Sequence, residues 1–181
     1  FNVLNEMLNT VFLGAFIPEF KGIANRIQYD EYHVYPVDRH LLRTVQTLKE
    51  FGSSGDKDIP SLCRDIYKEL KDRKLLLWAT LLHDIGKGKP GKNHSLKGAK
   101  ITRALFTRRG FQPNEVDTIS FLIQEHLLLM KAATRRDIND EETALLCAKK
   151  VKDVNRLKML YLLTVADAIS TGPKAWTGWS S

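Results

Sequence analysis

The sequence predicts an all-α fold in a single domain, residues 1–181, and three observations support this prediction. Apolar residues recur at the three- or four-residue spacing of a helix along nearly the whole chain. No segment alternates apolar and polar residues as a half-buried strand does. Hydrophobic residues make up 43% of the chain, which is enough for a substantial core and too many for a disordered protein. Because the chain begins with Phe1 rather than Met, we expect it to be a fragment of a longer protein.

Proline, glycine and capping residues divide the first half of the chain into predicted helices and loops. A helix over residues 5–16 should end near Pro18, and the aromatic segment 29–35 should be irregular. Asp38 is placed to cap the next helix, and Pro60 should start another one after a loop rich in glycine and serine. The helix that begins at Asp38 has an apolar face made of Leu41, Leu42, Val45 and Leu48.

The second half of the chain is divided in the same way. Gly88, Pro90 and Gly91 form a turn after an unusually apolar helix, and Gly110 ends the helix that follows this turn. The predicted helices cover residues 75–86 and 95–109, a long stretch from Pro113 to residue 130, a short stretch that starts at Asp140, and residues 154–170.

Charge and cysteine content restrict the class of protein. The net charge of +7 suits a polyanionic or phosphorylated partner, but a solvated basic face would explain it equally well. No apolar run reaches the roughly 18 residues of a membrane span, and no signal-peptide pattern opens the chain. Cys63 and Cys147 are solitary, so we expect them to be reduced and in the core. We therefore expect a cytoplasmic protein with no membrane association, and among polyanionic partners we expect a phosphorylated protein before a nucleic acid.

An adjacent histidine and aspartate end the most apolar predicted helix. His83 and Asp84 follow residues 75–82, which should be buried on nearly every side. A carboxylate beside an imidazole is costly in such surroundings unless a cation compensates it, and the usual compensation is a divalent metal. Further residues of ligand type lie in equally apolar or helical surroundings, namely His40, His94, His126 and Asp167.

Each of these residues also has a purely structural interpretation. A lone histidine on an apolar face can be a hydrogen-bonded core residue, and Asp167 could pair with Arg26 or Arg156. The structural interpretation would require several independent polar insertions into core-like helices, so their conjunction favours a metal site. Imidazole with carboxylate suits Mn, Fe or Zn, and Mg if waters complete its coordination. One ion would acidify a water molecule, and a pair would also clamp the attacking and departing oxygens.

The order of these residues resembles the signature of the HD-domain metal-dependent phosphohydrolases. The run His-Asp-Ile-Gly-Lys at residues 83–87, followed by further histidines, is similar to the members of that family with a second metal position. The resemblance implies an HD-domain helical bundle that binds one or two divalent ions, with Mn or Mg expected first and Fe or Zn next. It implies that one ion is held by His40, His83, Asp84 and Asp167, and that Asp84 bridges to a second ion held by His94 and His126.

Several segments resemble a narrower group, the central HD domain of the bacterial PII uridylyltransferase/uridylyl-removing enzymes. These segments are residues 14–20, 29–40, 135–137, 160–167 and 176–179. The resemblance implies that the substrate is the uridylylated tyrosine of the nitrogen-regulatory PII protein, from which hydrolysis releases UMP. It also implies a nucleotidyltransferase domain and ACT domains elsewhere in the full-length, multifunctional chain. The residues alone support only metal-assisted phosphoester hydrolysis.

The resemblance also assigns roles near the metal ligands. Asp84 would act in catalysis as the bridging ligand, and Lys87 could contact a nonbridging phosphate oxygen or be a surface lysine at a helix C-terminus. His33 could bind phosphate or donate a proton to the leaving group, or make a structural hydrogen bond. Arg135 and Arg136 could contact phosphate or the protein substrate, or form a solvated pair in a loop.

Two other functions remain open at this point. One is an HD phosphodiesterase that acts on a cyclic dinucleotide, a nucleotide or an RNA end. The other is a non-catalytic regulatory module that keeps a structural metal. The intact set of ligand-type residues argues against the non-catalytic module.

Overall fold

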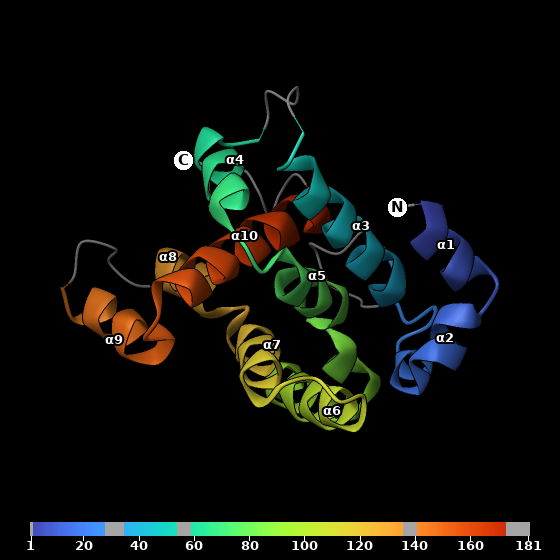
Figure 1. Cartoon of the computed structure of the whole chain (residues 1–181). Helices are drawn as coiled ribbons and strands as arrows, with labels where there is room; N and C mark the ends of the chain where they lie inside the picture. Colours follow the sequence, from blue (N-terminus) through green and yellow to red (C-terminus); the bar gives the residue numbers. More distant parts are fainter. Residues whose placement is uncertain (1, 28–34, 54–58, 136–140, 173–181) are drawn as a thin grey trace.

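The computed structural model describes residues 2–27, 35–53, 59–135 and 141–172 (Figure 1). Within these ranges the chain is helical and contains no strand, so the all-α prediction is confirmed. The α-helices are α1 (Asn2–Asn9), α2 (Phe12–Phe16), α3 (Val37–Glu50), α4 (Ser61–Glu69), α5 (Arg73–Leu82), α6 (His94–Arg108), α7 (Pro113–Glu125), α8 (Leu128–Arg135), α9 (Glu141–Val151) and α10 (Val154–Thr171), and the 3-10 helices are η1 (Pro18–Gly22) and η2 (Ile85–Gly88).

Helix α10 is the centre of the bundle. It packs against α3, α5 and α7, and Figure 1 shows it crossing the middle of the molecule with α1 and α2 at one edge. α6 pairs with α7 on one side of this centre. Because these neighbours cover α10, apolar residues on several of its sides are buried, and each buried Leu or Val side chain contributes about 1.5–3 kcal/mol of hydrophobic stabilisation. Its fully buried residues include Leu160, Leu162, Leu163, Val165 and Ala166.

The first predicted helix, residues 5–16, is wrong as a single element. α1 ends at Asn9, and Val11 adopts a left-handed backbone with φ 61° before α2 begins. Leu13 and Ile17 are nonetheless buried, as the apolar spacing requires. The spacing reports which residues face the core, but it does not show whether the backbone stays helical between them. The predicted boundary at Pro18 is confirmed, because Pro18 starts η1.

Two other predicted helices end earlier than expected. α5 ends at Leu82, so the predicted helix over residues 75–86 is interrupted before its end, and His83 and Asp84 lie between α5 and η2. α7 ends at Glu125 and α8 starts afresh at Leu128, so the predicted helix from Pro113 to residue 130 is two helices. In both places a histidine follows the last helical residue, and its ring takes part in ending the helix.

The start of α3 corrects the predicted cap at Asp38. α3 begins at Val37, and the Asp38 carboxylate accepts hydrogen bonds from the backbone N–H groups of Asn25 and Arg39, each at 2.8 Å. Asn25 has a left-handed backbone with φ 54°, which turns its N–H group away from helical partners. Asp38 therefore ties the segment after η1 to α3. Pro60 precedes α4 directly, as predicted.

Other sequence predictions have mixed outcomes. Cys63 is buried, but Cys147 is only half-buried on α9, so the prediction that both lie in the core is wrong for Cys147. The start of the short helix at Asp140 lies outside the described residues, and α9 begins at Glu141. None of the described helices combines the length and apolarity that a bilayer crossing requires.

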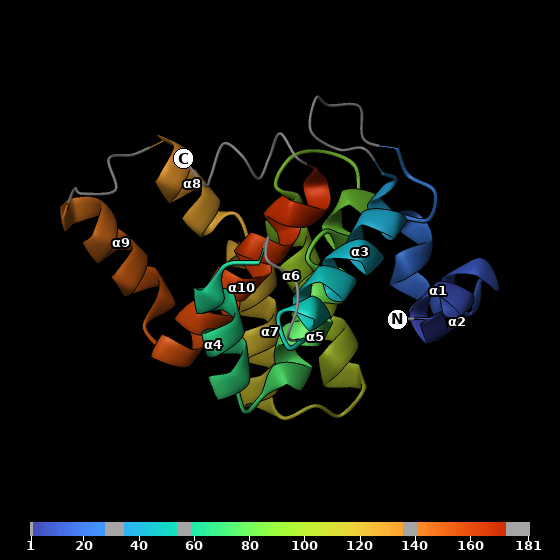
Figure 2. The same cartoon turned by 90° about the horizontal axis from the view of Figure 1, so that it is seen from above.

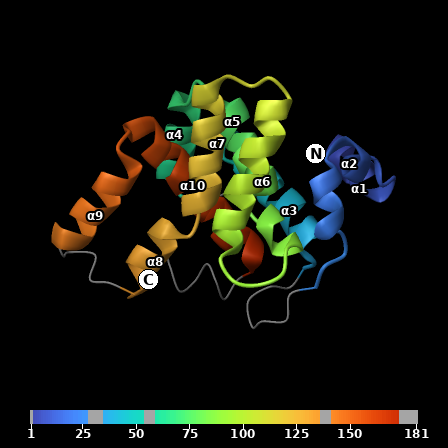
Figure 3. The ribbon, with the colours of Figure 1, turned by 90° about the horizontal axis from the view of Figure 1, so that it is seen from below.

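One end of the bundle gathers the segments that matter for function. Figures 2 and 3 show the green loop before α6 beside the last turns of α10 and the start of α3. At this end α6 packs directly on η2 at a glycine. A Cβ atom on Gly86 would lie 2.0 Å from the His94 carbonyl oxygen and 2.6 Å from the Gly98 nitrogen. Only glycine allows this approach, which places His94 next to Asp84.

We expect Gly86→Ala to lower the free energy of unfolding by about 1–3 kcal/mol, because α6 must move away from η2. The same movement displaces His94, so divalent-metal affinity should also fall. Chemical denaturation and metal titration measure the two effects. Gly110→Ala is the control, since Gly110 has φ +75° and open space around it; the left-handed backbone costs about 1–2 kcal/mol and leaves His94 in place. Unchanged metal affinity in folded Gly86→Ala would contradict this role for the close approach.

Candidate metal centre

Six histidine and aspartate side chains converge at this end of the bundle. They form two groups of three, and within each group the candidate ligand atoms lie within 4.8 Å of one another. Each group could hold a metal ion, so the structure brings together all six residues that the sequence analysis proposed as ligands. The first group consists of His40, His83 and Asp167, and the second of Asp84, His94 and His126.

The first group joins α3, the end of α5 and α10. His40 Nε2 lies 2.9 Å from Asp167 Oδ1 and 3.3 Å from His83 Nε2. His83 Nε2 lies 3.5 Å from the same carboxylate oxygen. Three ligand-type atoms thus face one point inside a helical core, which favours a cation there over three independent core residues.

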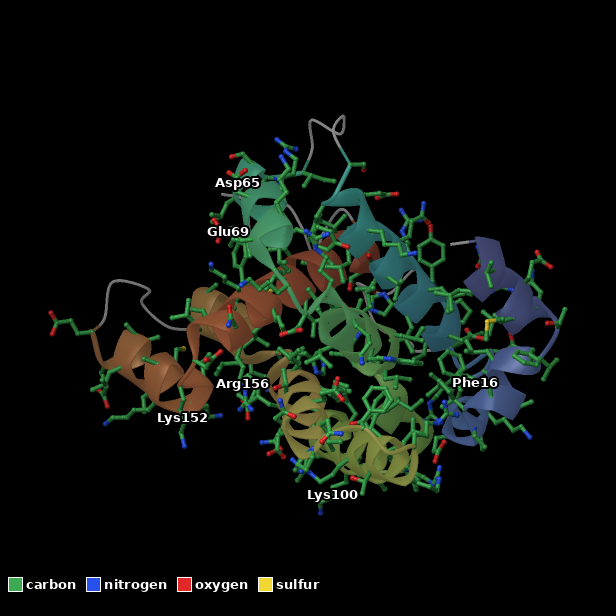
Figure 4. The ribbon with its side chains drawn as sticks, in the orientation of Figure 1. Phe16, Asp65, Glu69, Lys100, Lys152 and Arg156 are labelled. Atoms are coloured by element: carbon green, nitrogen blue, oxygen red, sulfur yellow. The ribbon has the colours of Figure 1, made fainter. Side chains whose placement is uncertain are left out.

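Among the described residues Asp167 pairs with neither Arg26 nor Arg156, the two structural alternatives considered from the sequence. Arg156 lies eleven positions earlier on α10, about 16 Å along the helix axis. Its guanidinium group lies over the ring of Phe121, 5.2 Å from the centroid, beside α7 (Figure 4). The partners of the Asp167 carboxylate in the first group are therefore His40 and His83, as the metal interpretation requires.

The second group is built around one carboxylate oxygen. Asp84 Oδ1 lies 3.3 Å from His94 Nε2 and 3.8 Å from His126 Nε2. This oxygen is buried and accepts no hydrogen bond within the described part of the chain. A buried carboxylate oxygen without a hydrogen-bond donor is costly, and two imidazole nitrogens face it. These residues therefore fit a divalent cation.

Asp84 also faces the first group. Its Oδ2 atom lies 3.6 Å from His83 Nε2, while Oδ1 belongs to the second group. The two oxygens of one carboxylate thus point to the two groups. Asp84 is therefore the residue that could bridge two ions.

The ends of α5 and α7 orient two of the histidines. His83 Nδ1 lies 2.9 Å from the carbonyl oxygen of Thr80, and His126 Nδ1 lies 2.8 Å from that of Ile123. A carbonyl oxygen only accepts, so each Nδ1 donates, and it satisfies a carbonyl group that the helix end leaves free. A neutral ring then presents the lone pair of Nε2 to the site. This is the arrangement expected of metal-binding histidines.

The carboxylates and imidazoles shift one another's pKa values. Burial alone would raise the pKa of Asp167 and of Asp84, but nearby cationic groups hold both below their usual range, His83 being the largest such influence on each. Burial alone would lower the pKa of His83, but the Asp167 and Asp84 carboxylates outweigh it and raise this pKa to about 9. Burial and the charge of His83 lower the pKa of His126 to about 4. Without a bound ion the two carboxylates therefore favour the protonated form of His83, whereas a metal would require its neutral form.

Lys87 is paired with Asp84 and is more buried than a surface lysine at a helix C-terminus would be. Its Nζ atom lies 2.6 Å from Asp84 Oδ2, and its side chain is largely buried, with 12% exposure. It is therefore not a plain surface lysine, and its contact with a nonbridging phosphate oxygen stays a prediction. Lys87 contributes to the low pKa of Asp84 and holds that carboxylate in position.

Three other proposed site residues are not placed by the structure. His33 and Arg136 lie outside the described residues. Arg135 is the last residue of α8, but its side chain lies outside the described part of the chain. Their roles stay predictions.

The sequence analysis did not assign two cations that line a pocket beside His94, namely Arg26 and Lys89. Lys89 follows Lys87 in a Lys-Gly-Lys turn, and that spacing was an available signal. Arg26 gave no such signal, because only the packing of η1 on η2 brings its segment to this end of the bundle.

The chain also matches the model of a known protein family. The family model described as HD domain matches residues 37–171 of the 181. The matched region begins at the first residue of α3 and ends at the last residue of α10, and it contains all six residues of the two groups.

We expect His126→Ala to remove one of two Mn²⁺ binding events, because it takes one of three ligand-type residues from the second group and leaves the first group intact. Calorimetric titration of the metal-free protein with Mn²⁺ measures the number of binding events. His40→Ala is the matched variant and should affect the other event. Circular dichroism checks that both variants fold. Two unchanged events in His126→Ala would show that this residue binds no ion.

We expect metal binding at pH 7 to release about one proton, because His83 must lose the proton that its raised pKa retains. The release should fade as the pH rises through about 9, where His83 is already neutral. Calorimetric titrations in buffers with different ionisation enthalpies measure the number of protons. Binding heats that are independent of the buffer at pH 7 would contradict the protonation of His83.

Proposed function

Because this chain belongs to the HD-domain family, we propose that its two His/Asp groups hold divalent ions and catalyse hydrolysis of a phosphodiester. Membership of the family supports metal-dependent phosphohydrolase activity in general. The observation that supports the proposal most strongly is the buried Asp84 carboxylate, whose two oxygens face the two groups. A single ion would leave one of these groups without its cation.

The protein residues have distinct tasks in this proposal. The imidazoles and Asp167 fix the positions of the ions, and the hydrogen bonds from His83 and His126 to backbone carbonyls keep their rings from turning. Lys87 holds Asp84 through the 2.6 Å ion pair and adds positive charge near the reacting phosphate. Divalent ions bound there would acidify a water molecule and neutralise charge on the phosphoryl group. Mn and Mg are the ions we expect first, with Fe and Zn as candidates because of the imidazole-rich ligand set.

The specific substrate we propose is the uridylylated tyrosine of the PII signalling protein, from which UMP is released. The support is the resemblance of residues 14–20, 29–40, 135–137 and 160–167 to the uridylyl-removing enzymes. A tyrosyl oxygen is a fair leaving group, because the phenol pKa is about 10. We propose on the same grounds that nucleotidyltransferase and ACT domains belong to the full-length chain. They would supply regulation and part of the docking surface for PII.

The test is release of UMP from purified uridylylated PII by this chain with Mn²⁺ or Mg²⁺. His83→Ala and Asp167→Ala should abolish release, because each removes a ligand-type residue from the first group. Lys87→Ala should lower turnover by roughly 10–100-fold, as expected for a residue that supports a ligand. Gln124→Ala is the matched control, since this exposed residue lies two positions before His126 and outside both groups.

Other substrates distinguish the remaining functions. If the chain leaves uridylylated PII intact but cleaves a cyclic dinucleotide, a nucleotide or an RNA end, the proposed substrate is wrong and a general HD phosphodiesterase replaces it. If the chain binds metal but hydrolyses none of these, nor bis(p-nitrophenyl) phosphate, the enzyme proposal fails and a non-catalytic regulatory module remains.

A further inference from the structure

A small basic pocket opens beside the second group. Its volume is about 260 Å³, and its lining includes Arg26, Lys87, Lys89 and His94. Pockets that enclose a whole drug-sized ligand usually measure about 300–1,000 Å³. This pocket lies just below the small end of that range and has room for a compact group such as a phosphate.

Two residues connect the pocket to the metal centre. His94 lines the pocket, and its Nε2 atom lies 3.3 Å from Asp84 Oδ1. Lys87 also lines it, and its Nζ atom lies 2.6 Å from Asp84 Oδ2. A group held in the pocket is therefore next to the bridging carboxylate.

The charges of the pocket favour an anion. Among the residues that the structure describes, its lining contains three permanent cations and no carboxylate. Asp84 already engages Lys87, whereas Arg26 and Lys89 make no ion pair with a carboxylate among the residues that the structure describes. These two are therefore the cations with charge to offer a ligand.

The fold holds both cations at the pocket. Arg26 donates its backbone N–H to the Ile23 carbonyl at 3.1 Å and accepts at its own carbonyl from Val37 N–H at 2.9 Å. η1 packs on η2 through two glycines: a Cβ atom on Gly88 would lie 3.0 Å from the carbonyl carbon of Gly22. This close approach brings the segment after η1 next to the turn that contains Lys89. The two cations thus come from separate segments fixed to each other by backbone contacts.

We propose that Arg26 and Lys89 bind the nonbridging phosphate oxygens of the substrate in this pocket, and this inference rests on the proposed phosphodiester hydrolysis. The guanidinium group of Arg26 can donate two parallel hydrogen bonds to a phosphate, and Lys89 adds a point charge. Arg26, Ile27 and Lys89 are exposed, so the pocket is open at the surface. An open phosphate pocket suits a phosphoester presented on the surface of another protein. Lys87, in contrast, is a positioning residue that acts through Asp84.

The experiment compares Arg26→Gln and Lys89→Gln with the parent chain, all loaded with Mn²⁺. The Kd for UMP, measured by calorimetry, should rise about tenfold or more in each variant, as expected for the loss of one charge-assisted hydrogen bond. KM for bis(p-nitrophenyl) phosphate should rise similarly, with kcat changing less. The Kd of Arg26→Lys for UMP should lie between that of Arg26→Gln and that of the parent. Lys92→Gln is the control, because this exposed lysine of the same loop does not line the pocket.

The outcomes separate this inference from the proposed function. If the variants keep the parent's Kd for UMP and its KM, or if Lys92→Gln loses as much affinity, the pocket is not a phosphate site. If the parent binds UMP through Arg26 and Lys89 but hydrolyses no phosphoester, the pocket is a phosphate site and the proposed function is wrong. Mn²⁺ content equal to that of the parent in all variants shows that the losses do not come from the metal centre. Inorganic phosphate in place of UMP shows whether the phosphoryl group alone is sufficient.

Discussion

Two carboxylates in a helical bundle, the buried Asp84 and the partly buried Asp167, impose the electrostatic constraint on which the functional end of this molecule depends. Removing an ionised carboxylate from water costs several kcal/mol unless nearby groups compensate for it. Asp167 is compensated by His40 and His83, and one oxygen of Asp84 by Lys87. The other oxygen, Asp84 Oδ1, accepts no hydrogen bond within the described ranges, although two imidazole nitrogens face it. A divalent cation is the partner that fits this set of atoms.

The surrounding fold meets this constraint by ending helices where ligand-type residues are needed. α5 and α7 both stop just before a histidine, and each histidine returns its Nδ1 hydrogen to a carbonyl of the last turn. The same interaction therefore ends the helix and aims Nε2 at the site. Gly86 is also needed, because it lets α6 approach closely enough for His94 to reach Asp84. The contacts that end α5 and α7 and pack α6 on η2 therefore also orient the ligand-type side chains.

The sequence was sufficient for the fold class and for the six residues that the structure brings together, because polar residues in strongly apolar helices need a shared explanation. It was not sufficient for the breaks after Asn9, Leu82 and Glu125, since apolar spacing continues across each break. The ion pair between Lys87 and Asp84 and the place of Arg26 depend on distances between segments, which spacing along one chain does not contain. Local pattern therefore predicted which residues form the site, and tertiary packing determines how they are paired.

The most direct test of the two-ion centre is the anomalous scattering of a Mn²⁺-loaded crystal of this chain. The account predicts two anomalous peaks, one between His40, His83 and Asp167 and one between His94 and His126, with an oxygen of Asp84 directed at each. Peaks elsewhere on the protein, or none at this end of the bundle at saturating Mn²⁺, would contradict it.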